Sequence, residues 1–418
     1  MKWNDVLEYK SVRYAFHIEL SNNCNSQCPF CPRFLRGTPV VVPSLINGEI
    51  TIDNFKKWIT PEILSKTYIF NFCGTQGDPI TARHLPEIAE YIAETNPKTK
   101  FQIRTNGGVR NKEFWQRLGK VVNKNKEIVF SVDGLSDTNH LYRRNVKWDK
   151  LITNMQTFID AGGKAVWECL IFKHNEHQMD EIKELAIKMG FADVLFKSPI
   201  GFENIQLKKS IPMPVYDKNK QLDYVLEPSL NYLNSQFEYD PSYQHNQTQI
   251  ESDKSCEIWP WEIPYDEWKD LEKYEINCKS HIPGINLREV YINPHGNVYP
   301  CCFIAGGMDA RHSSPDVEQV RQILGKTENY NLELSSLDDI LRFFDTAIGS
   351  KWESTHEDGR CAYCSKTCGA PSPTDTDRLY VDGKKDKMIG KKKKQTLIPI
   401  IINEKIRNKI LKHQKTLI

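Results

Sequence analysis

The sequence has no long apolar run. Its longest aliphatic stretch, near Leu397 to Ile402, is broken by Pro399 and falls far short of the roughly 20 apolar residues that a membrane-spanning helix needs. The first residues, Met1 to Asp5, show no basic stretch followed by an apolar one, so the sequence predicts no signal peptide. We therefore expect a soluble, cytoplasmic protein that makes no membrane contact.

The chain also carries little net charge, +2 over 418 residues, but the charge is unevenly placed. The segment from Lys384 to Ile418 holds 12 basic and 2 acidic residues, which leaves the rest of the chain with a net charge of −8. A Lys-rich tail can contact nucleic acid or another acidic partner, although a solvated, partly helical terminus is the favoured interpretation. We expect residues 384–418 to form a basic tail on a mildly acidic body.

A fourth cysteine is missing near the first three. Cys24, Cys28 and Cys31 are separated by three residues and then two, and the nearest cysteine downstream is Cys73. A ferredoxin-type cluster takes four cysteines and passes only electrons, whereas three thiolates leave one iron open to a small molecule. Half a zinc site and disulfides are the alternatives. A structural zinc site closes with four ligands, and nothing in the sequence indicates an oxidising compartment.

Strand-like and helix-like runs alternate through the first half of the chain. This alternation predicts parallel strands with right-handed crossovers, and six such units fall short of the eight of a full barrel. The fold class predicted is therefore α/β, a partial (β/α)6 TIM-like barrel with a smaller C-terminal α+β cysteine-rich domain. The predicted strands are Tyr14–Leu20, Tyr68–Cys73, Phe101–Thr105, Ile128–Val132, Ala165–Phe172 and Val194–Lys197. The predicted helices are Asp53–Ser65 (with Asp53 as its cap), His84–Thr95, Lys112–Asn123, Trp148–Ala161 and His177–Met189.

The unusual residues follow the ends of these strands. They include the first three cysteines, the run 74–79, Asn106-Gly107-Gly108, Asp133-Gly134, and Lys173 with Asn175. In a βα barrel these positions line the C-terminal mouth, where barrel enzymes place their sites. The predicted domains are a barrel core at 1–200, a linking region at 201–255, a cysteine-rich domain at 256–383 and the tail at 384–418.

A second set of cysteines lies in the C-terminal half. A strand, a turn at His295-Gly296-Asn297 and a second strand lead into Cys301, and a C-x2-C knuckle follows at Cys361 and Cys364. Such a set can hold zinc or an iron–sulfur cluster, and spacing alone does not separate the two. Twelve cysteines in a chain of this kind are more often metal ligands or catalytic groups than disulfides.

The spacing of Cys24, Cys28 and Cys31 resembles the signature of the radical S-adenosylmethionine (SAM) enzymes. The resemblance implies that these cysteines hold a [4Fe-4S] cluster whose open iron binds SAM, and that further residues contact the nucleoside. Gln76-Gly77-Asp78-Pro79 matches the family's Gly-Gly-Glu-Pro loop, with Gln and Asp in place of Gly and Glu. The implied SAM contacts are Phe30 at the adenine, Gly77 and Asp78 at the amino group, Ser131 and Asp133 at the ribose, Arg144 (or Arg143) at the carboxylate, and Asn175 nearby.

The hairpin before Cys301 resembles the SPASM and twitch extensions of that family, whose cysteines hold auxiliary [4Fe-4S] clusters. The full SPASM pattern has seven cysteines and two clusters, and this chain departs from it, because no cysteine follows Cys368. One auxiliary cluster is therefore expected, with zinc as the alternative. The predicted ligands are Cys278, Cys301, Cys361 and Cys364, with Cys368, Cys302 or Cys256 as possible substitutes.

The resemblance implies reductive cleavage of SAM to a 5′-deoxyadenosyl radical that abstracts a hydrogen atom from a substrate. The implied substrate is a peptide or protein side chain, or a small sugar or alcohol, and the implied electron donor is a flavodoxin or ferredoxin. The competing hypothesis is a zinc- or iron–sulfur-containing protein that binds nucleic acid or transfers electrons without SAM chemistry.

Overall fold

The structure is a computed structural model, and it describes most of the N-terminal half and parts of the C-terminal half. The described residues are 13–204, 207, 209–233, 237–243, 272, 275–276, 281–282, 287–310, 315–369 and 380–381. The predicted ligands Cys278 and Cys256 and the basic tail lie outside these residues.

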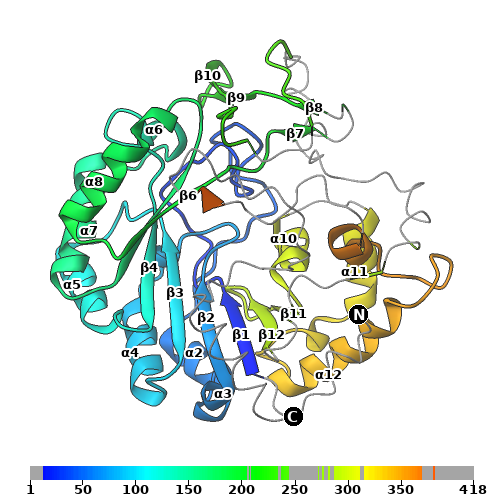
Figure 1. Cartoon of the computed structure of the whole chain (residues 1–418). Helices are drawn as coiled ribbons and strands as arrows, with labels where there is room; N and C mark the ends of the chain where they lie inside the picture. Colours follow the sequence, from blue (N-terminus) through cyan, green and yellow to red (C-terminus); the bar gives the residue numbers. More distant parts are fainter. Residues whose placement is uncertain are drawn as a thin grey trace, which may run out of the picture.

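A curved sheet of ten strands forms the centre of the molecule (Figure 1). Six strands follow one another in chain order and pair in parallel, which confirms the predicted series of βα units. They are β1 (Arg13–Ile18), β2 (Thr67–Phe72), β3 (Lys100–Thr105), β4 (Lys126–Ser131), β5 (Ala165–Leu170) and β6 (Asp193–Lys197). Two-stranded pairs follow β6, formed by β7 (Glu203–Asn204) with β8 (Lys209–Ser210) and β9 (Met213–Tyr216) with β10 (Leu222–Leu226).

Helices cover the outer face of this sheet (Figure 1). They are α2 (Ile52–Trp58), α3 (Pro61–Lys66), α4 (Leu85–Thr95), α5 (Lys112–Val121), α7 (Trp148–Asp160) and α8 (Met179–Met189). The short helix α6 (Asn139–Tyr142) lies at the mouth of the barrel, where Tyr142 packs with Cys28 and Phe172. The single helix predicted over Asp53–Ser65 is wrong, because Thr60 caps a new helix whose first residue is Pro61. The cap of the first helix is Thr51, whose hydroxyl accepts a hydrogen bond from Asn54 N, and Asp53 lies in the first turn.

Alternate residues of each strand face opposite sides of the sheet, and the two sides differ in chemistry. The outer face is apolar and packs on the helices through residues such as Phe70, which is fully buried against Phe55. The inner face is polar: the strand register places His17, Arg104 and Glu168 on it. The core therefore lies between sheet and helices, and the lumen of the partial barrel is lined by groups that can bind or react.

The C-terminal part continues the same sheet. Its strand β12 (Leu287–Ile292) pairs in parallel with β1, and β13 (Val298–Tyr299) folds back on β12 as the predicted hairpin. Gly296 takes the left-handed conformation, φ +79°, at the turn. The remaining strands are β11 (His281–Ile282) beside β12 and β14 (Tyr380–Val381) beside β6. The helices of this part are α10 (Cys302–Ala310), α11 (Pro315–Leu324), α12 (Leu337–Ala347) and α13 (Ala362–Cys364).

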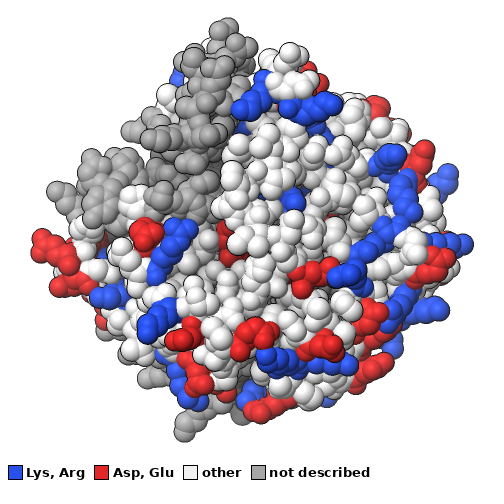
Figure 2. All heavy atoms as spheres, turned by 180° about the vertical axis from the view of Figure 1, so that it is seen from behind, with Lys and Arg blue, Asp and Glu red and all other residues white. Residues whose placement is uncertain are grey.

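Two surface properties bear on function. Among the described residues, no helix combines the length and apolarity that a membrane crossing requires. Figure 2 shows acidic and basic side chains interleaved over the face turned to the viewer, with no continuous basic area among its coloured atoms.

Candidate functional site

The loop that follows β1 carries the first three cysteines to the mouth of the barrel. Cys31 N donates to Cys28 O at 3.0 Å, which closes a tight turn, and Gln27 N donates to Arg144 O at 3.1 Å. Cys28 is buried, whereas Cys24 and Cys31 are partly buried. The backbone hydrogen bonds therefore fix the loop against the segment that follows β4.

The three sulfurs are close enough to influence one another electrostatically. Burial raises the pKa of the Cys31 thiol to about 12, with the charge of Cys28 as the next cause. Burial also raises the pKa of the Cys24 thiol well above its ordinary value, and Asp78, Cys28 and Cys31 add to the shift. A bound cationic metal centre would lower the pKa of these thiols instead, because a thiol that coordinates a metal loses its proton.

Donors surround the sulfurs as expected for metal-bound thiolates. Ser26 supplies two contacts, its N–H to Cys24 Sγ at 3.4 Å and its hydroxyl beside Cys28 Sγ at 3.1 Å. Arg143 Nη1 donates to Cys28 Sγ at 3.6 Å, and Asn106 Nδ2 donates to Cys24 Sγ at 3.7 Å. Hydrogen bonds to thiolate sulfurs help to set a cluster's reduction potential, so these donors belong to the same site.

The number of thiolates suits a cluster with one open iron. A structural zinc site closes with four ligands, and this loop supplies three. Among the described residues, the sulfurs of Cys24, Cys28 and Cys31 do not all lie within 4.8 Å of one another. Three thiolates leave one iron of a [4Fe-4S] cluster open to a small molecule.

The predicted SAM loop at 76–79 is held tightly against the cysteine loop. Gln76 N and Gly77 N donate to the buried Glu19 Oε1 at 2.8 and 2.7 Å, and a side chain at Gly77 would meet Ser21 O at 1.9 Å. Asp78 uses its carboxylate inside the protein, since Oδ2 accepts from Asn106 N at 2.8 Å and from Asn106 Nδ2 at 2.7 Å. The structure thus gives Asp78 the role of joining this loop to Asn106, and its contact to SAM stays a prediction.

Asp133 and Arg143 form an ion pair beside the cysteines. Arg143 Nε lies 2.6 Å from Asp133 Oδ2, and Asp133 is fully buried. The guanidinium of Arg144 instead pairs with Asp223 Oδ2 at 2.9 Å and donates to Tyr216 O at 3.3 Å. The structure therefore brings Arg143, and not the guanidinium of the predicted Arg144, against a cysteine sulfur.

We predict that Arg143→Gln weakens SAM binding by about 10- to 100-fold, because it removes a charge-assisted contact worth about 1.5–3 kcal/mol. Arg144→Gln, the matched control, should weaken SAM binding by less than about 3-fold. Equilibrium binding of SAM to the reconstituted protein measures both. The opposite ranking would show that Arg144 is the carboxylate partner.

The other predicted SAM residues have varied surroundings. The Phe30 ring packs edge-on against Phe202, with centroids 5.0 Å apart, so its backbone remains the part suited to a nucleoside. Ser131 ends β4 on the inner face and is partly exposed. Asn175 is fully buried, accepts from Phe172 N at 2.8 Å and donates to Leu170 O at 2.9 Å. These bonds explain Asn175 as a turn-forming residue, and its contact to SAM stays a prediction.

The sequence reasoning missed a charged cluster in the lumen. Arg104 Nη1 lies 2.6 Å from Glu168 Oε2, and Glu168 also pairs with the fully buried Lys197. Burial alone would raise the pKa of Glu168, but the charges of Arg104 and Lys197 outweigh it and lower the pKa to about 2. The available signal was a charged residue near the C-terminal end of β3, β5 and β6: Arg104, Glu168 and Lys197.

The C-terminal cysteines form a second site. Cys301 follows β13. Cys361 precedes α13 and Cys364 ends it, and Cys368 lies in the π-helical turn Ser365–Gly369. A hydrogen bond to Cys361 raises the pKa of the Cys364 thiol, and burial and the charges of Cys361, Cys368 and Cys301 raise it further. The structure thus brings Cys301, Cys361 and Cys364 of the predicted set together with Cys368, which was predicted as a further ligand or substitute. The predicted ligand Cys278 lies outside the described residues.

Four thiolates can hold a structural zinc ion or an iron–sulfur cluster. In the described part of the chain, no three of these sulfurs lie within 4.8 Å of one another. An auxiliary [4Fe-4S] cluster at this site stays a prediction, with zinc as the alternative.

We predict that Cys364→Ala lowers the iron content by about four atoms per chain and leaves the first site loaded, because the two cysteine sets use separate loops. Iron analysis together with electron paramagnetic resonance of the reduced protein measures both. Loss of a single zinc atom with iron unchanged would contradict the auxiliary cluster.

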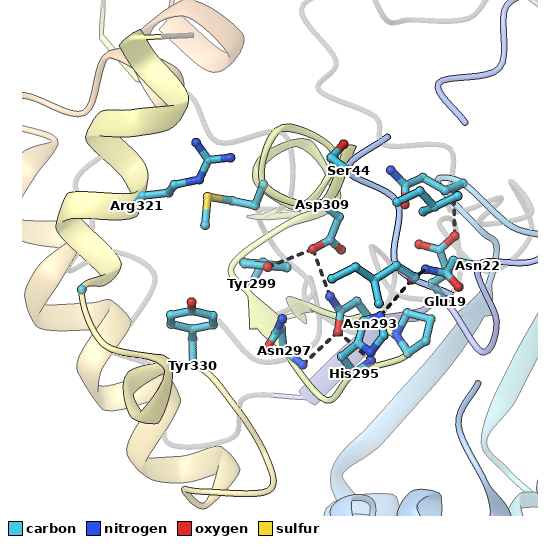
Figure 3. Close-up of a pocket in the computed structure, with 16 residues that line it drawn as sticks. Glu19, Asn22, Ser44, Asn293, His295, Asn297, Tyr299, Asp309, Arg321 and Tyr330 are labelled. Carbon is cyan, nitrogen blue, oxygen red and sulfur yellow. Dashed lines mark hydrogen bonds between the residues drawn. The ribbon is translucent and has the colours of Figure 1, made fainter. Parts of the chain in front are cut away.

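A cavity of about 360 Å³ lies between the segment with Glu19, Asn22 and Ser44 on one side and the C-terminal hairpin on the other (Figure 3). Asp309 reaches into it and accepts from Tyr299 Oη and Asn293 Nδ2, each at 2.9 Å. Burial, with the charge of Glu19 second, raises the pKa of Asp309 to about 7. Among the described residues, nothing accepts a hydrogen bond from the buried Nε2 of Gln76, which also lines the cavity. The cavity therefore offers a free donor and a titratable acceptor to a polar ligand.

Comparison with known proteins gives one family match. Residues 18–186 match the sequence model of the Radical SAM superfamily, and this segment contains Cys24, Cys28, Cys31 and the strands from β2 to β5. Enzymes of this superfamily use a [4Fe-4S] cluster and S-adenosylmethionine. No curated protein matches the chain.

Several solved structures are similar at low sequence identity. Streptococcus suis SuiB bound to S-adenosylmethionine is 14% identical, with 71% of this chain and 62% of that chain covered and a TM-score of 0.43. AnSMEcpe with bound AdoMet and the Cp18Cys peptide is 14% identical, with 84% and 88% covered and a TM-score of 0.44. BtrN in complex with AdoMet and 2-DOIA is 14% identical, with 85% and 93% covered and a TM-score of 0.36. The chain thus spans less than two thirds of the SAM-bound SuiB chain.

Proposed function

We propose that this protein is a radical SAM enzyme that modifies a peptide or protein side chain, or a small sugar or alcohol. The observation that carries the proposal is the loop with Cys24, Cys28 and Cys31, whose sulfurs are close enough to raise one another's pKa, within a segment that matches the superfamily. When bound, the cluster and SAM supply a 5′-deoxyadenosyl radical that takes a hydrogen atom from an unreactive carbon. The electron that starts this chemistry comes from a flavodoxin or ferredoxin.

The chain's own residues hold and orient the reactants. Cys24, Cys28 and Cys31 bind the cluster. Arg143, whose guanidinium is held by Asp133 and lies 3.6 Å from Cys28 Sγ, can pair with the carboxylate of SAM. The loop at 76–79, held by Glu19, supports the amino group of SAM. The tight packing of Gly77 against Ser21 keeps water out of this junction.

The cavity beside the cysteine loop supports a polar substrate. The free Gln76 Nε2 can donate to a carbonyl or hydroxyl oxygen, and Asp309, whose pKa is near 7, can accept from an amide or hydroxyl. Both a peptide bond and a sugar offer such a pair of groups, so both substrate classes stay in the proposal. The four C-terminal cysteines hold an auxiliary cluster that can accept an electron from the substrate radical.

Anaerobic incubation with SAM and dithionite tests this function. The reconstituted protein should release 5′-deoxyadenosine and methionine, and both should be absent without the reductant. A fully reconstituted, reduced sample that yields no 5′-deoxyadenosine would contradict the proposal. It would leave the competing hypothesis of an electron-transfer or nucleic-acid-binding protein.

A further inference from the structure

Three metal-binding side chains meet in the barrel lumen, and one of them, Cys302, is next in the chain to Cys301 of the second cysteine set. They are His17 on β1, Glu289 on β12 and Cys302 at the start of α10, and their donor atoms all lie within 4.8 Å of one another. Since β1 and β12 pair in parallel with Ala15 opposite Glu289, His17 and Glu289 share the inner face of the sheet. Among the described residues, this is the one group compact enough for a single ion.

The His17 ring is held in the way that metal-binding histidines are held. Its Nε2–H donates to the backbone oxygen of Cys73 at 2.7 Å, and a carbonyl can only accept, so the lone pair stays on Nδ1. The ring also packs against Tyr291, with centroids 4.8 Å apart. Metal-binding histidines almost always donate their other ring N–H to a carbonyl or carboxylate, which fixes the tautomer and the ring orientation.

The other two ligands are already joined. The Cys302 thiol and the Glu289 carboxylate are hydrogen-bonded to each other, and Glu289 is buried. A divalent ion can take the place of the shared proton, which then leaves to solvent. The resulting thiolate and carboxylate balance the two positive charges of the ion, so the site formed by the three ligands and the ion carries no net charge.

We propose that His17, Glu289 and Cys302 bind one Zn²⁺ ion in the barrel lumen. One nitrogen, one oxygen and one sulfur ligand suit zinc, and three protein ligands leave its fourth tetrahedral position for water or a substrate atom. This centre takes its ligands from β1, β12 and the start of α10, and it uses Cys302 as a ligand here instead of as a substitute ligand in the second cysteine set. The proposal does not depend on SAM chemistry.

Zinc binding to the full-length, anaerobically reconstituted protein tests this centre. After dialysis against metal-free buffer and titration with Zn²⁺, elemental analysis should find one tightly held zinc per chain with the iron content unchanged. X-ray absorption at the zinc edge should show one sulfur at about 2.3 Å and nitrogen or oxygen ligands at about 2.0–2.2 Å. The absence of retained zinc, or a zinc shell of four sulfurs, would overturn the proposal.

Variants identify the ligands. His17→Ala and Glu289→Gln should each weaken zinc binding at least about 10-fold, whereas His177→Ala, which changes an exposed histidine, should not change it. Glu289→Gln keeps the shape of the side chain, so it carries the test if His17→Ala fails to fold. Wild-type zinc affinity in the folded Glu289→Gln protein would overturn the assignment.

Discussion

Replacing Cys28 with alanine is expected to remove about four irons per chain and to lower 5′-deoxyadenosine formation at least about 1,000-fold. The buried Cys28 lies at the centre of the loop, where Arg143 Nη1 and the Ser26 hydroxyl both contact its sulfur. Two remaining cysteines cannot hold a cluster that needs three ligands, so SAM loses the iron to which it binds. Iron analysis and quantitative chromatography of 5′-deoxyadenosine, with dithionite as reductant, measure the effect.

The control for this experiment is Cys169→Ala. Cys169 is a buried cysteine on the outer face of β5 that belongs to neither cysteine set. This variant should keep its iron and at least about half of the activity, because the change removes one sulfur whose hydrogen bonds, to Leu170 O at 3.5 Å and from Asn175 Nδ2 at 3.8 Å, are long and weak. Full iron content in Cys28→Ala, or equal losses in the two variants, would show that the loop does not bind the cluster.

Most of the barrel could be predicted because its signals are local. The alternation of apolar runs and capped helices marks each βα unit, and all six predicted strands overlap β1 to β6. The prediction failed where a local detail decided the outcome, as at Thr60 and Pro61, which start a second helix inside the predicted one. The boundary between α2 and α3 lies at a capping residue and a proline. The apolar pattern continues across this boundary, so the pattern alone predicts one long helix.

The joining of the C-terminal part to the barrel could not be predicted. Strand β12 pairs with β1 although more than 250 residues separate them in the chain. The sequence of neither strand shows which strand is its partner. The lumen group of His17, Glu289 and Cys302 exists only because of this pairing. Sequence motifs revealed the cysteine sets because their members are close in the chain, and they could not reveal a site built from distant strands.

The arginine at the first site shows a different limit. Arg143 and Arg144 are neighbours in the sequence and equal in chemistry, so a motif match does not separate them. Only the direction of each side chain does: Arg143 points to Asp133 and Cys28, and Arg144 points to Asp223. A choice between adjacent residues of the same type therefore needs the fold.

Glu168→Gln is expected to destabilise the protein by about 3 kcal/mol at pH 7. Glu168 lies between Arg104 and the fully buried Lys197, and removing one partner of a buried ion pair leaves uncompensated charge at a cost of about 3–5 kcal/mol. Equilibrium unfolding in urea, followed by circular dichroism, measures the loss. The matched control is Glu90→Gln, which breaks the partly exposed pair with Arg117 at 2.6 Å and should cost less than about 1 kcal/mol.

The effect of Glu168→Gln should depend on pH in a defined direction. The charges of Arg104 and Lys197 outweigh burial and lower the pKa of Glu168 from 4.5 to about 2, so the unfolded chain binds this proton more readily than the folded one. The stabilisation is therefore complete above about pH 5 and disappears as the pH falls from about 4.5 towards 2. The difference between wild type and Glu168→Gln should shrink across that range. A difference that stays constant between pH 7 and pH 3 would show that the carboxylate is not ionised between its two cations.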